Sequence, residues 1–509
     1  MNDNYLKILN LEELKKKILL EKTKGKKIVH CHGVFDIVHV GHIKHFKSAK
    51  KLGNFLVVSV TSDKFVNKGP GRPVFNHNLR TEVIASLECV DAVFINNFQT
   101  PVSLINSIKP DIYFKGPDYK KTSHDKTKNI IKEIQSIKKV GGKIMFSKDM
   151  TFSSSNLINN YYNLLSPLQK SFIKNISKKY SFDFITKEIN KIKSLKIFLV
   201  GETIIDEYIF GQVLGKSGKE PHLVMQQESK EQYLGGAAAI ANHLSTFSKK
   251  INFLTITGRD KVYLSFIKKS LRKNISANYL FKKNVPTILK TRFIDQISKN
   301  KLLGVYKIND EKLEKNLEKE FQNLIKKKSK GNDLILISDY GHGLISSSTA
   351  RILLSQNKFV AINAQVNASN NGYHSLRKYK KINTLIINEN ELRHEMRDKI
   401  TEFENLALKL AKNHDIKNLV VTRGKKGAFM LNSKMETFYC PAFANEVLDK
   451  VGAGDAMLAI ITLCLKIKMP EELALFMGSL AGATAVENIG NSKSIDKNEL
   501  LRQVEYLIK

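Results

Sequence analysis

His39 and His42 lie three residues apart, directly after a glycine turn, where the pattern of the chain changes from strand to helix. Residues i and i+3 share one helical face, so both imidazoles would lie side by side at the first helical turn. A helix N-terminus presents free amides that attract phosphate, and Gly41 leaves room for phosphate to approach the backbone. The spacing therefore predicts a site that binds a nucleoside triphosphate.

The segment before the histidines fits this prediction. A β-branched run that begins at Ile28 leads into a turn at Gly33, and Phe35 follows the turn. Strand, glycine turn and helix in this order form the phosphate-binding first loop of an open α/β sheet. Because an isolated H-x-x-H is often no more than a pair of surface or core histidines, the prediction depends on further segments.

Those segments place cations and hydroxyl groups where phosphate could be bound. A lysine in a Gly/Pro-rich loop and a lysine beside a glycine turn both suit the edge where open sheets bind ligands. A hydroxyl cluster can cap a helix while its amides hold phosphate. In chain order the residues concerned are Lys68, Arg72, Arg80, Lys115, Asp118, Ser153, Ser154 and Ser155.

This series closely resembles the H-x-G-H signature of the cytidylyltransferase-like nucleotidyltransferases. Over roughly residues 25–160 it looks most like the adenylyltransferase half of the bifunctional heptose-phosphate kinase/adenylyltransferases. The resemblance implies in-line attack of a sugar-1-phosphate oxygen on the α-phosphorus of ATP or CTP, with pyrophosphate leaving and no covalent enzyme intermediate. It assigns charge stabilisation to His39, His42, Lys68, Lys115 and a magnesium ion, and nucleotide binding to Gly33, Phe35, Gly41, Arg72, Arg80, Asp118, Ser153, Ser154 and Ser155.

A second chemical motif lies near the other end of the chain. Gly452, Ala453 and Gly454 precede Asp455 and an apolar helix. Consecutive small residues at a helix start expose backbone amides as an anion-binding nest, and a carboxylate in the first turn can accept the proton of an attacking hydroxyl. The motif predicts phosphoryl transfer with Asp455 as the base.

The motif resembles the G-A-G-D signature of the ribokinase-like, or phosphofructokinase-B, sugar kinases, and further segments match in order. The resemblance implies an ATP- and Mg²⁺-dependent sugar kinase whose sugar is a small-molecule substrate. It assigns the sugar to Asp206, Gly235, Gly236, Asn242 and Arg292, magnesium to Asn388 and Glu391, and ATP to Thr422, Gly424, Gly427, Gly452, Ala453 and Gly454.

Departures from the heptose-kinase pattern fall on the sugar side. Ala239 stands where that pattern has asparagine, His342 replaces the lysine of D-Y-x-K-G, and Gln365 ends the segment that should read D-P-K. The usual heptose enzyme also places its kinase first and its transferase second, the reverse of this chain. We therefore expect an active sugar kinase and leave its sugar open.

The composition limits the class of protein. At 509 residues two or three domains are expected, and no apolar run approaches the about 18 residues of a membrane span. The net charge of +35 could indicate nucleic-acid binding, but only 11 of the 83 basic residues are arginine, the residue preferred for base contacts, and the lysines are spread evenly. Four scattered cysteines fit a reducing cytoplasm.

Short apolar runs alternate with polar periodic segments in both halves, which predicts an α/β protein of two doubly wound domains. We expect a Rossmann-like nucleotidyltransferase over residues 1–160, a lysine-rich helical connector over residues 161–194 and a ribokinase-like kinase over residues 195–509. The charged stretch from Glu311 to Lys330 predicts a solvated helix.

Taken together, the motifs predict a bifunctional cytoplasmic enzyme that phosphorylates a sugar or sugar phosphate and makes a heptose-like NDP-sugar. It would bind no nucleic acid and no membrane and would form a homodimer or higher homo-oligomer. One alternative is a CTP-dependent cytidylyltransferase fused to a kinase for a different sugar or polyol. Another is a basic nucleic-acid-binding regulator built on inactive enzyme domains.

Overall fold

The chain forms two compact units in a computed structural model, which describes residues 6–66, 72–117, 129–147, 165–283, 285–365, 370, 375–444 and 446–508. The N-terminal unit takes residues 1–167 with residues 502–507 of the last helix, and the C-terminal unit takes residues 168–501. The functional boundaries expected from the sequence remain predictions.

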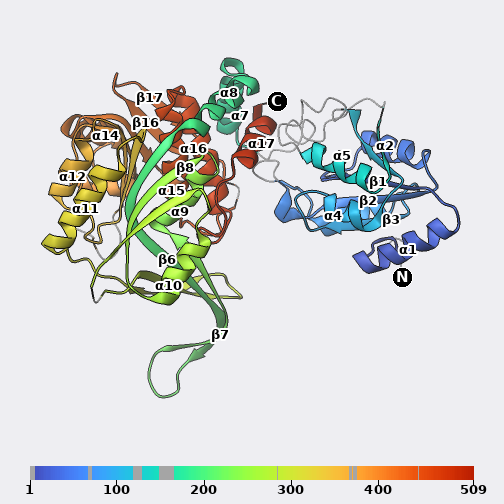
Figure 1. Cartoon of the computed structure of the whole chain (residues 1–509), viewed down its shortest axis with the longest axis horizontal. Helices are drawn as coiled ribbons and strands as arrows, with labels where there is room; N and C mark the ends of the chain where they lie inside the picture. Colours follow the sequence, from blue (N-terminus) through green and yellow to red (C-terminus); the bar gives the residue numbers. More distant parts are fainter. Residues whose placement is uncertain are drawn as a thin grey trace. The chain divides into compact units, whose positions relative to one another are not determined.

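The N-terminal unit is built on a five-stranded parallel sheet with the strand order β3-β2-β1-β4-β5, and helices cover both of its faces (Figure 1). This is the doubly wound arrangement expected from the alternating pattern. Its strands are β1 (Ile28–Gly33), β2 (Phe55–Thr61), β3 (Ala92–Asn96), β4 (Ile112–Lys115) and β5 (Lys143–Phe146). Its helices are α1 (Leu11–Thr23), α2 (Val40–Lys50), α3 (His77–Ala85), α4 (Val102–Ile108) and α5 (Asn129–Lys139), with a short 3₁₀ turn at Asp63–Phe65.

Alternating side chains of each strand face opposite helical layers. On one side Cys31 and Phe114 pack with Phe46 of α2 and the helix α3. On the other side Ile28 packs with the helices α1 and α4, and Tyr113 packs with α4 and α5. Strands buried on both faces read as nearly continuous apolar runs, which is why the five strands could be predicted from the sequence.

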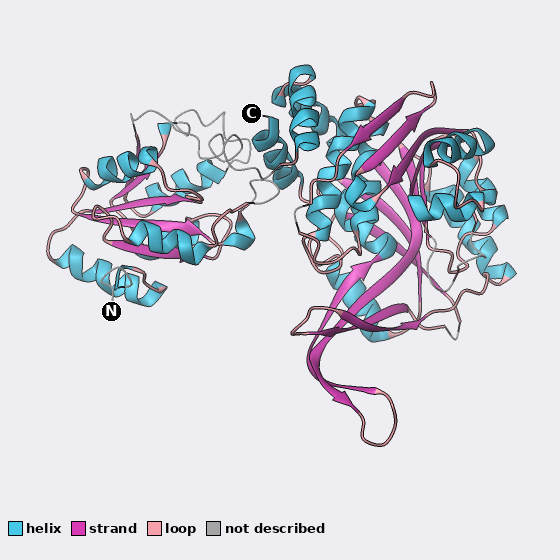
Figure 2. Ribbon diagram, turned by 180° about the vertical axis from the view of Figure 1, so that it is seen from behind, coloured by secondary structure: helices cyan, strands magenta, loops and turns pink. Residues whose placement is uncertain are grey.

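The C-terminal unit contains a central, mostly parallel sheet covered by helices on both faces (Figure 2). Its strands are β6 (Lys196–Lys216), β7 (Leu223–Gly235), β8 (Lys250–Thr257), β9 (Ile275–Phe281), β10 (Ile288–Asp295), β11 (Lys301–Lys307), β12 (Leu334–Asp339), β13 (Phe359–Ala364), β14 (Ile382–Asn388), β15 (Ile416–Thr422), β16 (Ala428–Asn432) and β17 (Thr437–Cys440). Its helices are α7 (Pro167–Lys179), α8 (Phe182–Lys191), α9 (Gly236–Ser245), α10 (Lys261–Ser270), α11 (Lys315–Lys328), α12 (Ser347–Leu354), α13 (Glu389–Met396), α14 (Phe403–His414), α15 (Ala453–Lys466), α16 (Glu471–Val486) and the first residues of α17 (Lys497–Ile508). Short 3₁₀ turns lie at Ile192–Ser194, Leu376–Lys378 and Gly424–Lys426.

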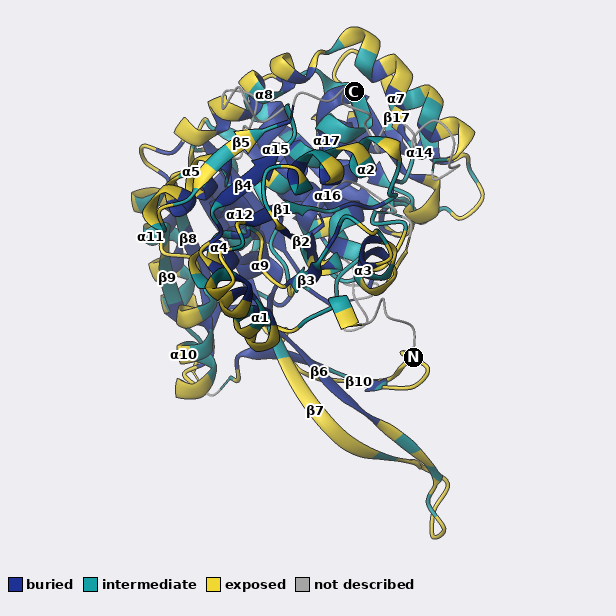
Figure 3. Ribbon diagram, turned by 90° about the vertical axis from the view of Figure 1, so that its right-hand side faces the viewer, coloured by how far each residue is buried: buried dark blue, intermediate teal, exposed yellow. Residues whose placement is uncertain are grey.

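The strand β6 is shared by two sheets. Its first residues, from Lys196 to Glu202, pair with β8 and β12 in the central sheet, and the rest pairs with β7 and β10. The second part of β6, with β7, β10 and β11, forms what we call the hairpin sheet, whose β6–β7 end extends away from the unit and is largely exposed (Figure 3). Beyond Gly201 the strand mixes apolar and polar residues. It stays buried as far as Gly211, and its last residues are exposed or half-buried.

The connector and the charged stretch differ from what the sequence suggested. Pro167 begins α7, where its missing N–H has no intrahelical partner to lose. The helices α7 and α8 belong to the C-terminal unit: Gln169 donates to the carbonyl of Ala442 at 2.6 Å, and the Phe172 ring lies 5.7 Å from that of Phe476. The helix α11 is not fully solvated, because it buries Phe321.

Apolar helices fill the core of the C-terminal unit. The helices α15 and α16 are buried along most of their length, which explains why they carry so few polar residues. Among the residues described, no helix is long and apolar enough to cross a membrane.

The close approach of β6 and β12 yields a stability prediction. A Cβ atom added at Gly201 would lie 2.3 Å from the carbonyl oxygen of Ser338. Gly201→Ala must therefore force the strands apart, and we expect it to lower the free energy of unfolding by about 1–3 kcal/mol. Urea unfolding followed by far-UV circular dichroism measures this loss. Gly218→Ala, in the open β6–β7 turn, is the matched control, and equal destabilisation of the two variants would contradict the strand-contact explanation.

Candidate active sites

His39 and His42 lie at the N-terminus of α2, as their spacing predicted. His39 is the N-cap, and its Nδ1 accepts a hydrogen bond from the Gly41 amide at 3.1 Å. The Nδ1 of His42 accepts the His39 amide at 3.4 Å, and the two rings stack with centroids 4.0 Å apart. Since Nδ1 is the acceptor in both rings, Nε2 carries the proton of each neutral imidazole. Burial lowers the pKa of His39, which favours this neutral form.

The ring of Phe35 packs against the histidine pair through His42. Its ring meets the His42 ring edge to face at a centroid distance of 5.4 Å and also packs on Phe46. Phe35 adopts a positive φ of 49°, and a Cβ at Gly33 would lie 2.9 Å from its ring. Both residues were assigned to nucleotide binding; their contacts here fix the loop that carries His39.

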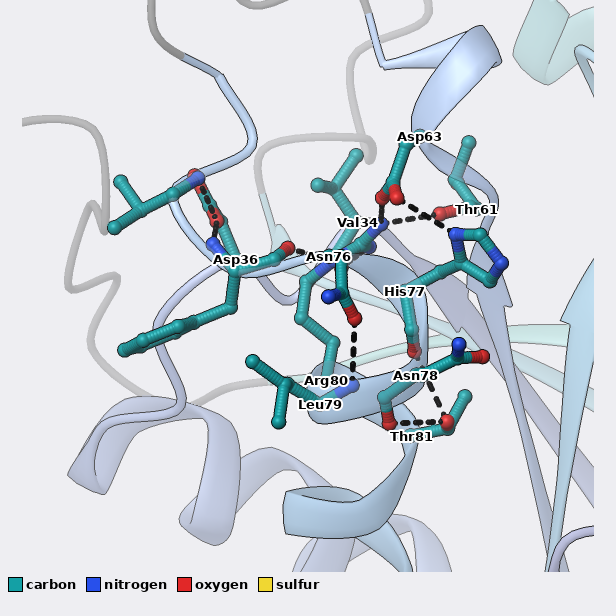
Figure 4. Close-up of polar contacts among 12 residues, drawn as sticks. Val34, Asp36, Thr61, Asp63, Asn76, His77, Asn78, Leu79, Arg80 and Thr81 are labelled. Atoms are coloured by element: carbon teal, nitrogen blue, oxygen red, sulfur yellow. Dashed lines mark hydrogen bonds and ion pairs between the residues drawn. The ribbon is translucent and has the colours of Figure 1, made fainter. Parts of the chain in front are cut away.

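Arg80 is enclosed by the protein (Figure 4). Its guanidinium donates to the carbonyl oxygens of Val34, Thr61 and Phe75 and to the carboxylate of Asp63. Burial opposes ionisation of Asp63, but hydrogen bonds from Arg80 and from His77 at 2.7 Å lower its pKa overall. Through these donors Arg80 holds the loop after β1 to the end of β2, and its predicted contact with the nucleotide stays a prediction.

Arg72 is also used within the protein. Its guanidinium forms an ion pair with Asp36 at 3.2 Å, and both side chains are almost fully buried. The Asp36 carboxylate further accepts the backbone amides of Val74 at 2.7 Å and Phe75 at 3.2 Å. Arg72 therefore ties the loop at Asp36 to the segment before α3. Its predicted contact with the nucleotide stays a prediction.

Lys115 lies at the carboxyl end of β4, at the ligand-binding edge expected for it. Its ammonium is 3.3 Å from the carboxylate of Glu133 on α5, and both side chains are about 7% exposed. The hydroxyl of Tyr113 donates to the same carboxylate oxygen at 2.9 Å. On the opposite face of β4, His45 of α2 stacks on Phe114 with centroids 4.8 Å apart. Sequence reasoning missed Glu133 and His45, since neither lies in a motif.

Two further histidines lie inside the sheet. His30 and His32 point from β1 and each places a ring nitrogen 2.8 Å from the hydroxyl of Ser59. Burial, helped by the positive charge of Lys115, lowers the pKa of His30 to about 3 and that of His32 well below its usual value. Both are therefore neutral and are held by the Ser59 hydroxyl; His30 is fully buried in β1, whereas His32 is partly exposed.

In the C-terminal unit, Asp455 lies in the first turn of α15, after Gly452 with a φ of 91°. The hydroxyl of Tyr340 donates to its carboxylate at 2.6 Å. Burial, together with the negative charge of Asp206, raises the pKa of Asp455 to about 7 although the Tyr340 hydrogen bond opposes this. A carboxylate with such a pKa is suited to accept a proton near neutral pH. Gly454 faces open space.

Asp206 lies on β6 where the strand enters the hairpin sheet. It forms an ion pair with Arg292 of β10 at 2.6 Å. A Cβ at Gly235 would lie only 2.1 Å from its second oxygen. Gly236 has a φ of 57°, and a Cβ there would lie 2.6 Å from the carbonyl oxygen of Glu202. The glycine pair is therefore required for β7 and α9 to approach this carboxylate. The predicted grouping of Asp206, Gly235, Gly236 and Arg292 is brought together.

Lys290 joins this group, although the sequence analysis did not identify it. It lies two residues before Arg292 on the same face of β10, is 7% exposed, and has its ammonium 5.7–5.8 Å from the rings of Tyr306 and Tyr340. Burial lowers its pKa, while Asp206 raises it. Its ammonium has no hydrogen bond or ion pair with the part of the chain described.

The loop that carries Tyr340 is fixed by a buried carboxylate. Glu202 accepts the backbone amides of Tyr340 at 3.0 Å and His342 at 3.2 Å. Burial and the negative charge of Asp339 raise the pKa of Glu202. These two hydrogen bonds therefore fix the position from which the Tyr340 hydroxyl donates to Asp455.

Asn242 does not join the sugar group. Its amide donates to the carbonyl of Ser270 at 3.0 Å and accepts the Arg272 amide at 3.2 Å, so it stabilises the turn after α10. The predicted sugar contact of Asn242 stays a prediction, because both of its side-chain hydrogen bonds here are local.

The residues predicted for the nucleotide and the metal meet at the ends of β14 and β15, where Thr422 is the register partner of Asn388. Asn388 and Glu391 form a reciprocal capping box for α13, each side chain accepting the other's backbone amide at 2.8 Å. The turn after Thr422 depends on Gly424 and Gly427, whose φ angles are positive.

Part of the predicted site lies outside the described residues: Lys68, Asp118, Ser153, Ser154 and Ser155. Within the described ranges, no group of three or more histidine, cysteine, aspartate or glutamate side chains could hold a metal ion.

Comparison with known families gives two matches along the chain. The pfkB family carbohydrate kinase model matches residues 194–498, and a cytidylyltransferase-like model matches residues 30–160. The solved structure of phosphofructokinase-2 from Escherichia coli in complex with substrates and products has a TM-score of 0.51 at 15% identity, covering 62% of this chain and all of that one. The same enzyme in complex with fructose-6-phosphate has a TM-score of 0.50 at 15% identity with equal coverage.

The curated relatives match the N-terminal part. "Bifunctional protein HldE" of Geotalea uraniireducens is 41% identical over 119 residues, which is 23% of this chain and 24% of the relative. The protein of the same name from Campylobacter fetus is 41% identical over 157 residues, or 30% of this chain and 31% of the relative. The chain thus spans only about a quarter to a third of the length of these relatives.

The position of Arg80 yields a prediction for the loop that carries His39. Arg80→Met removes all the donors and leaves the carbonyls of Val34 and Thr61 without this partner, at a cost of about 1–3 kcal/mol for each buried acceptor left unpaired. We expect faster hydrogen–deuterium exchange, measured by mass spectrometry, in peptides covering residues 33–40. Arg377→Met, which removes an exposed guanidinium, is the control. Unchanged exchange in Arg80→Met would contradict the supporting role.

Proposed function

Because this chain belongs to the pfkB family of carbohydrate kinases, we propose that it phosphorylates a sugar or sugar phosphate with ATP and also makes an NDP-sugar. It joins a carbohydrate kinase to a nucleotidyltransferase. The observation that carries the kinase proposal is Asp455, poised with a raised pKa in the first turn of α15 and electrostatically linked to Asp206.

In the proposed kinase reaction, Asp206 and Arg292 orient the sugar. The carboxylate of Asp455 takes the proton of the acceptor hydroxyl as its oxygen attacks the γ-phosphorus of ATP. The bond from that phosphorus to the β,γ-bridging oxygen breaks, and ADP leaves. The amides of Gly452, Ala453 and Gly454 stabilise negative charge on the transferring group. Thr422, Gly424 and Gly427 would bind the nucleotide.

The two cations of β10 favour an anionic sugar. Lys290 and Arg292 lie on one strand face, and the ammonium of Lys290 has no oxygen partner in the described chain. A phosphate group on the substrate would supply that partner. The fold neighbour solved with fructose-6-phosphate supports the same class. We therefore propose a sugar phosphate as the kinase substrate, with a heptose phosphate as the first one to test.

In the proposed nucleotidyl transfer, an oxygen of the sugar phosphate attacks the α-phosphorus of the nucleotide. The bond from that phosphorus to the α,β-bridging oxygen breaks, and pyrophosphate leaves. The Nε2–H groups of His39 and His42 donate to the oxygens on which charge develops. Lys115 and Lys68 would neutralise the phosphates.

A magnesium ion would suit both sites. Mg²⁺ is usually bound by one or two carboxylates, several waters and the substrate phosphates, so a three-residue cage is not needed. In the kinase, the Glu391 carboxylate and Asn388 are the chain's own groups for it, with their capping hydrogen bonds keeping them at the ends of β14 and α13. When bound, the ion neutralises phosphate charge.

The nucleotide of the N-terminal unit has two candidates. ATP is favoured by the similarity to the relatives named "Bifunctional protein HldE". The motifs of this unit resemble those of the adenylyltransferase half of bifunctional heptose enzymes. CTP, with a different sugar or polyol, is favoured by the cytidylyltransferase-like match. We further propose the functional boundaries 1–160, 161–194 and 195–509, a cytoplasmic location and a homo-oligomeric state.

One experiment tests the whole proposal. The purified full-length protein is incubated with ATP or CTP and a panel of sugars and sugar phosphates, and the products are identified by mass spectrometry. We expect a doubly phosphorylated sugar from the kinase and an NDP-sugar with pyrophosphate from the transferase. Turnover of unphosphorylated sugars alone would contradict the role given to Lys290 and Arg292.

For the kinase, Asp455→Asn should lower phosphoryl transfer by about 10²–10⁴-fold while pyrophosphate release continues.

In the unaltered protein Asp455 must lose its proton to act, so kcat/KM for phosphorylation should fall tenfold per pH unit below about pH 7. Tyr340→Phe removes a hydrogen bond that lowers this pKa, so the acid limb should move to higher pH. A profile that is flat between pH 5 and pH 8 would exclude Asp455 as the titrating base.

For nucleotidyl transfer, replacing His39 or His42 by alanine should lower kcat and kcat/KM together. This is the kinetic signature of an interaction made mainly in the transition state. Sugar phosphorylation by the same variant serves as the control for folding. A raised KM for the nucleotide at unchanged kcat would instead make both histidines ground-state binding groups.

A further inference from the structure

Glu133 is a buried carboxylate that no motif predicts, and it lies beside a residue proposed to bind phosphate. It is 5% exposed and faces β4 from α5. One oxygen, Oε2, is 3.3 Å from the ammonium of Lys115 and accepts the Tyr113 hydroxyl at 2.9 Å. The ammonium of Lys115 also lies 5.4 Å from the Tyr113 ring, so all three side chains form one cluster.

The pleat of β4 places this cluster on the opposite face of the sheet from the histidine pair. Tyr113 packs with α4 and α5, whereas its neighbour Phe114 packs with α2 and stacks on His45. Alternation along the strand puts Lys115 on the same face as Tyr113. The ammonium of Lys115 therefore points to Glu133 on α5. The backbone of Lys115 nevertheless lies at the carboxyl edge of the sheet, where α2 with its two histidines begins.

A carboxylate at this place competes with phosphate for the lysine. Lys115 and Glu133 are both shielded from water, so their attraction is screened less than that of a surface pair. An incoming anion must draw the ammonium away from Glu133 or share it, and it also meets the negative charge of the carboxylate. Both effects weaken the binding of every phosphate species at this edge.

We propose that Glu133 is a positioning residue that acts through Lys115 as a competing counter-ion, which weakens pyrophosphate binding and so speeds its release. The inference rests on the proposed nucleotidyl transfer, in which pyrophosphate leaves as the α-phosphorus bonds to the sugar-phosphate oxygen. Lys115 is needed while charge develops on the phosphates. Glu133 reclaims the ammonium afterwards, and the product loses its cation.

The test uses the full-length protein and pyrophosphate with Mg²⁺ as the probe. Glu133→Gln keeps the shape and can still accept the Tyr113 hydroxyl, but it removes the charge. We expect its dissociation constant for pyrophosphate, from titration calorimetry, to fall by about fivefold to twentyfold. KM for the nucleotide and kcat should fall together, because pyrophosphate release becomes slower. A purely structural role would leave both constants unchanged or raise KM.

Two variants guard the interpretation. Tyr113→Phe breaks the other hydrogen bond to Oε2 while it keeps the ion pair, and its pyrophosphate affinity should stay within twofold of the unaltered protein. Glu133→Asp withdraws the carboxylate from Lys115 and should tighten pyrophosphate binding to a smaller degree, which provides a second reading if Glu133→Gln folds poorly. Unchanged or weaker binding in both Glu133 variants overturns the inference.

A double-mutant cycle with Lys115→Ala separates this inference from the proposed function. If Glu133 acts mainly through the lysine, Glu133→Gln should tighten pyrophosphate binding much less once Lys115 is alanine, because only the direct repulsion by the carboxylate is then removed. Equal tightening with and without Lys115 would show direct repulsion and overturn the inference. If Lys115→Ala alone leaves transfer and pyrophosphate affinity intact, the role of Lys115 in the proposed function fails instead.

Discussion

The hydrogen bonds from two backbone amides to the buried carboxylate of Glu202 hold the kinase site together. Glu202 lies at the point where β6 leaves the central sheet for the hairpin sheet. By binding the amides of Tyr340 and His342 it fixes the loop after β12, and Tyr340 in turn reaches Asp455. A few residues further along β6, Asp206 meets Arg292. One strand therefore sets the distance between the proposed sugar-binding residues and the proposed base.

The two units build their proposed phosphate-binding sites around ionisable side chains in different ways. The C-terminal unit raises the pKa of a carboxylate by burying it at a helix start. The N-terminal unit caps a helix with two neutral imidazoles and keeps its cation paired with Glu133. In both, the helix begins at the carboxyl edge of a parallel sheet, the place where strand ends and backbone amides converge.

The sequence was sufficient where the signal is local. The pair His39 and His42, and the turn before Asp455, depend on spacing within one helical turn, and the buried parallel strands are continuous apolar runs. It was insufficient where a contact joins distant segments. The ion pair of Glu133 with Lys115 and the place of Lys290 beside Tyr340 follow from packing that no short pattern encodes. For the same reason the hydrogen bond from Asn242, close to the glycine pair in sequence, to the carbonyl of Ser270 could not be predicted from the sequence.

The enclosure of Arg80 bears on how this chain can change over evolutionary time. The composition favours lysine over arginine, with 11 arginines among 83 basic residues, so a drift from arginine to lysine is the expected direction of neutral change. At Arg80 four acceptors on three chain segments surround one planar group. An ammonium has only three N–H groups around a single nitrogen and cannot reach acceptors spread along a guanidinium. An exchange of arginine for lysine is therefore not tolerated at Arg80. The same exchange is harmless on the surface, but at this position selection would remove it.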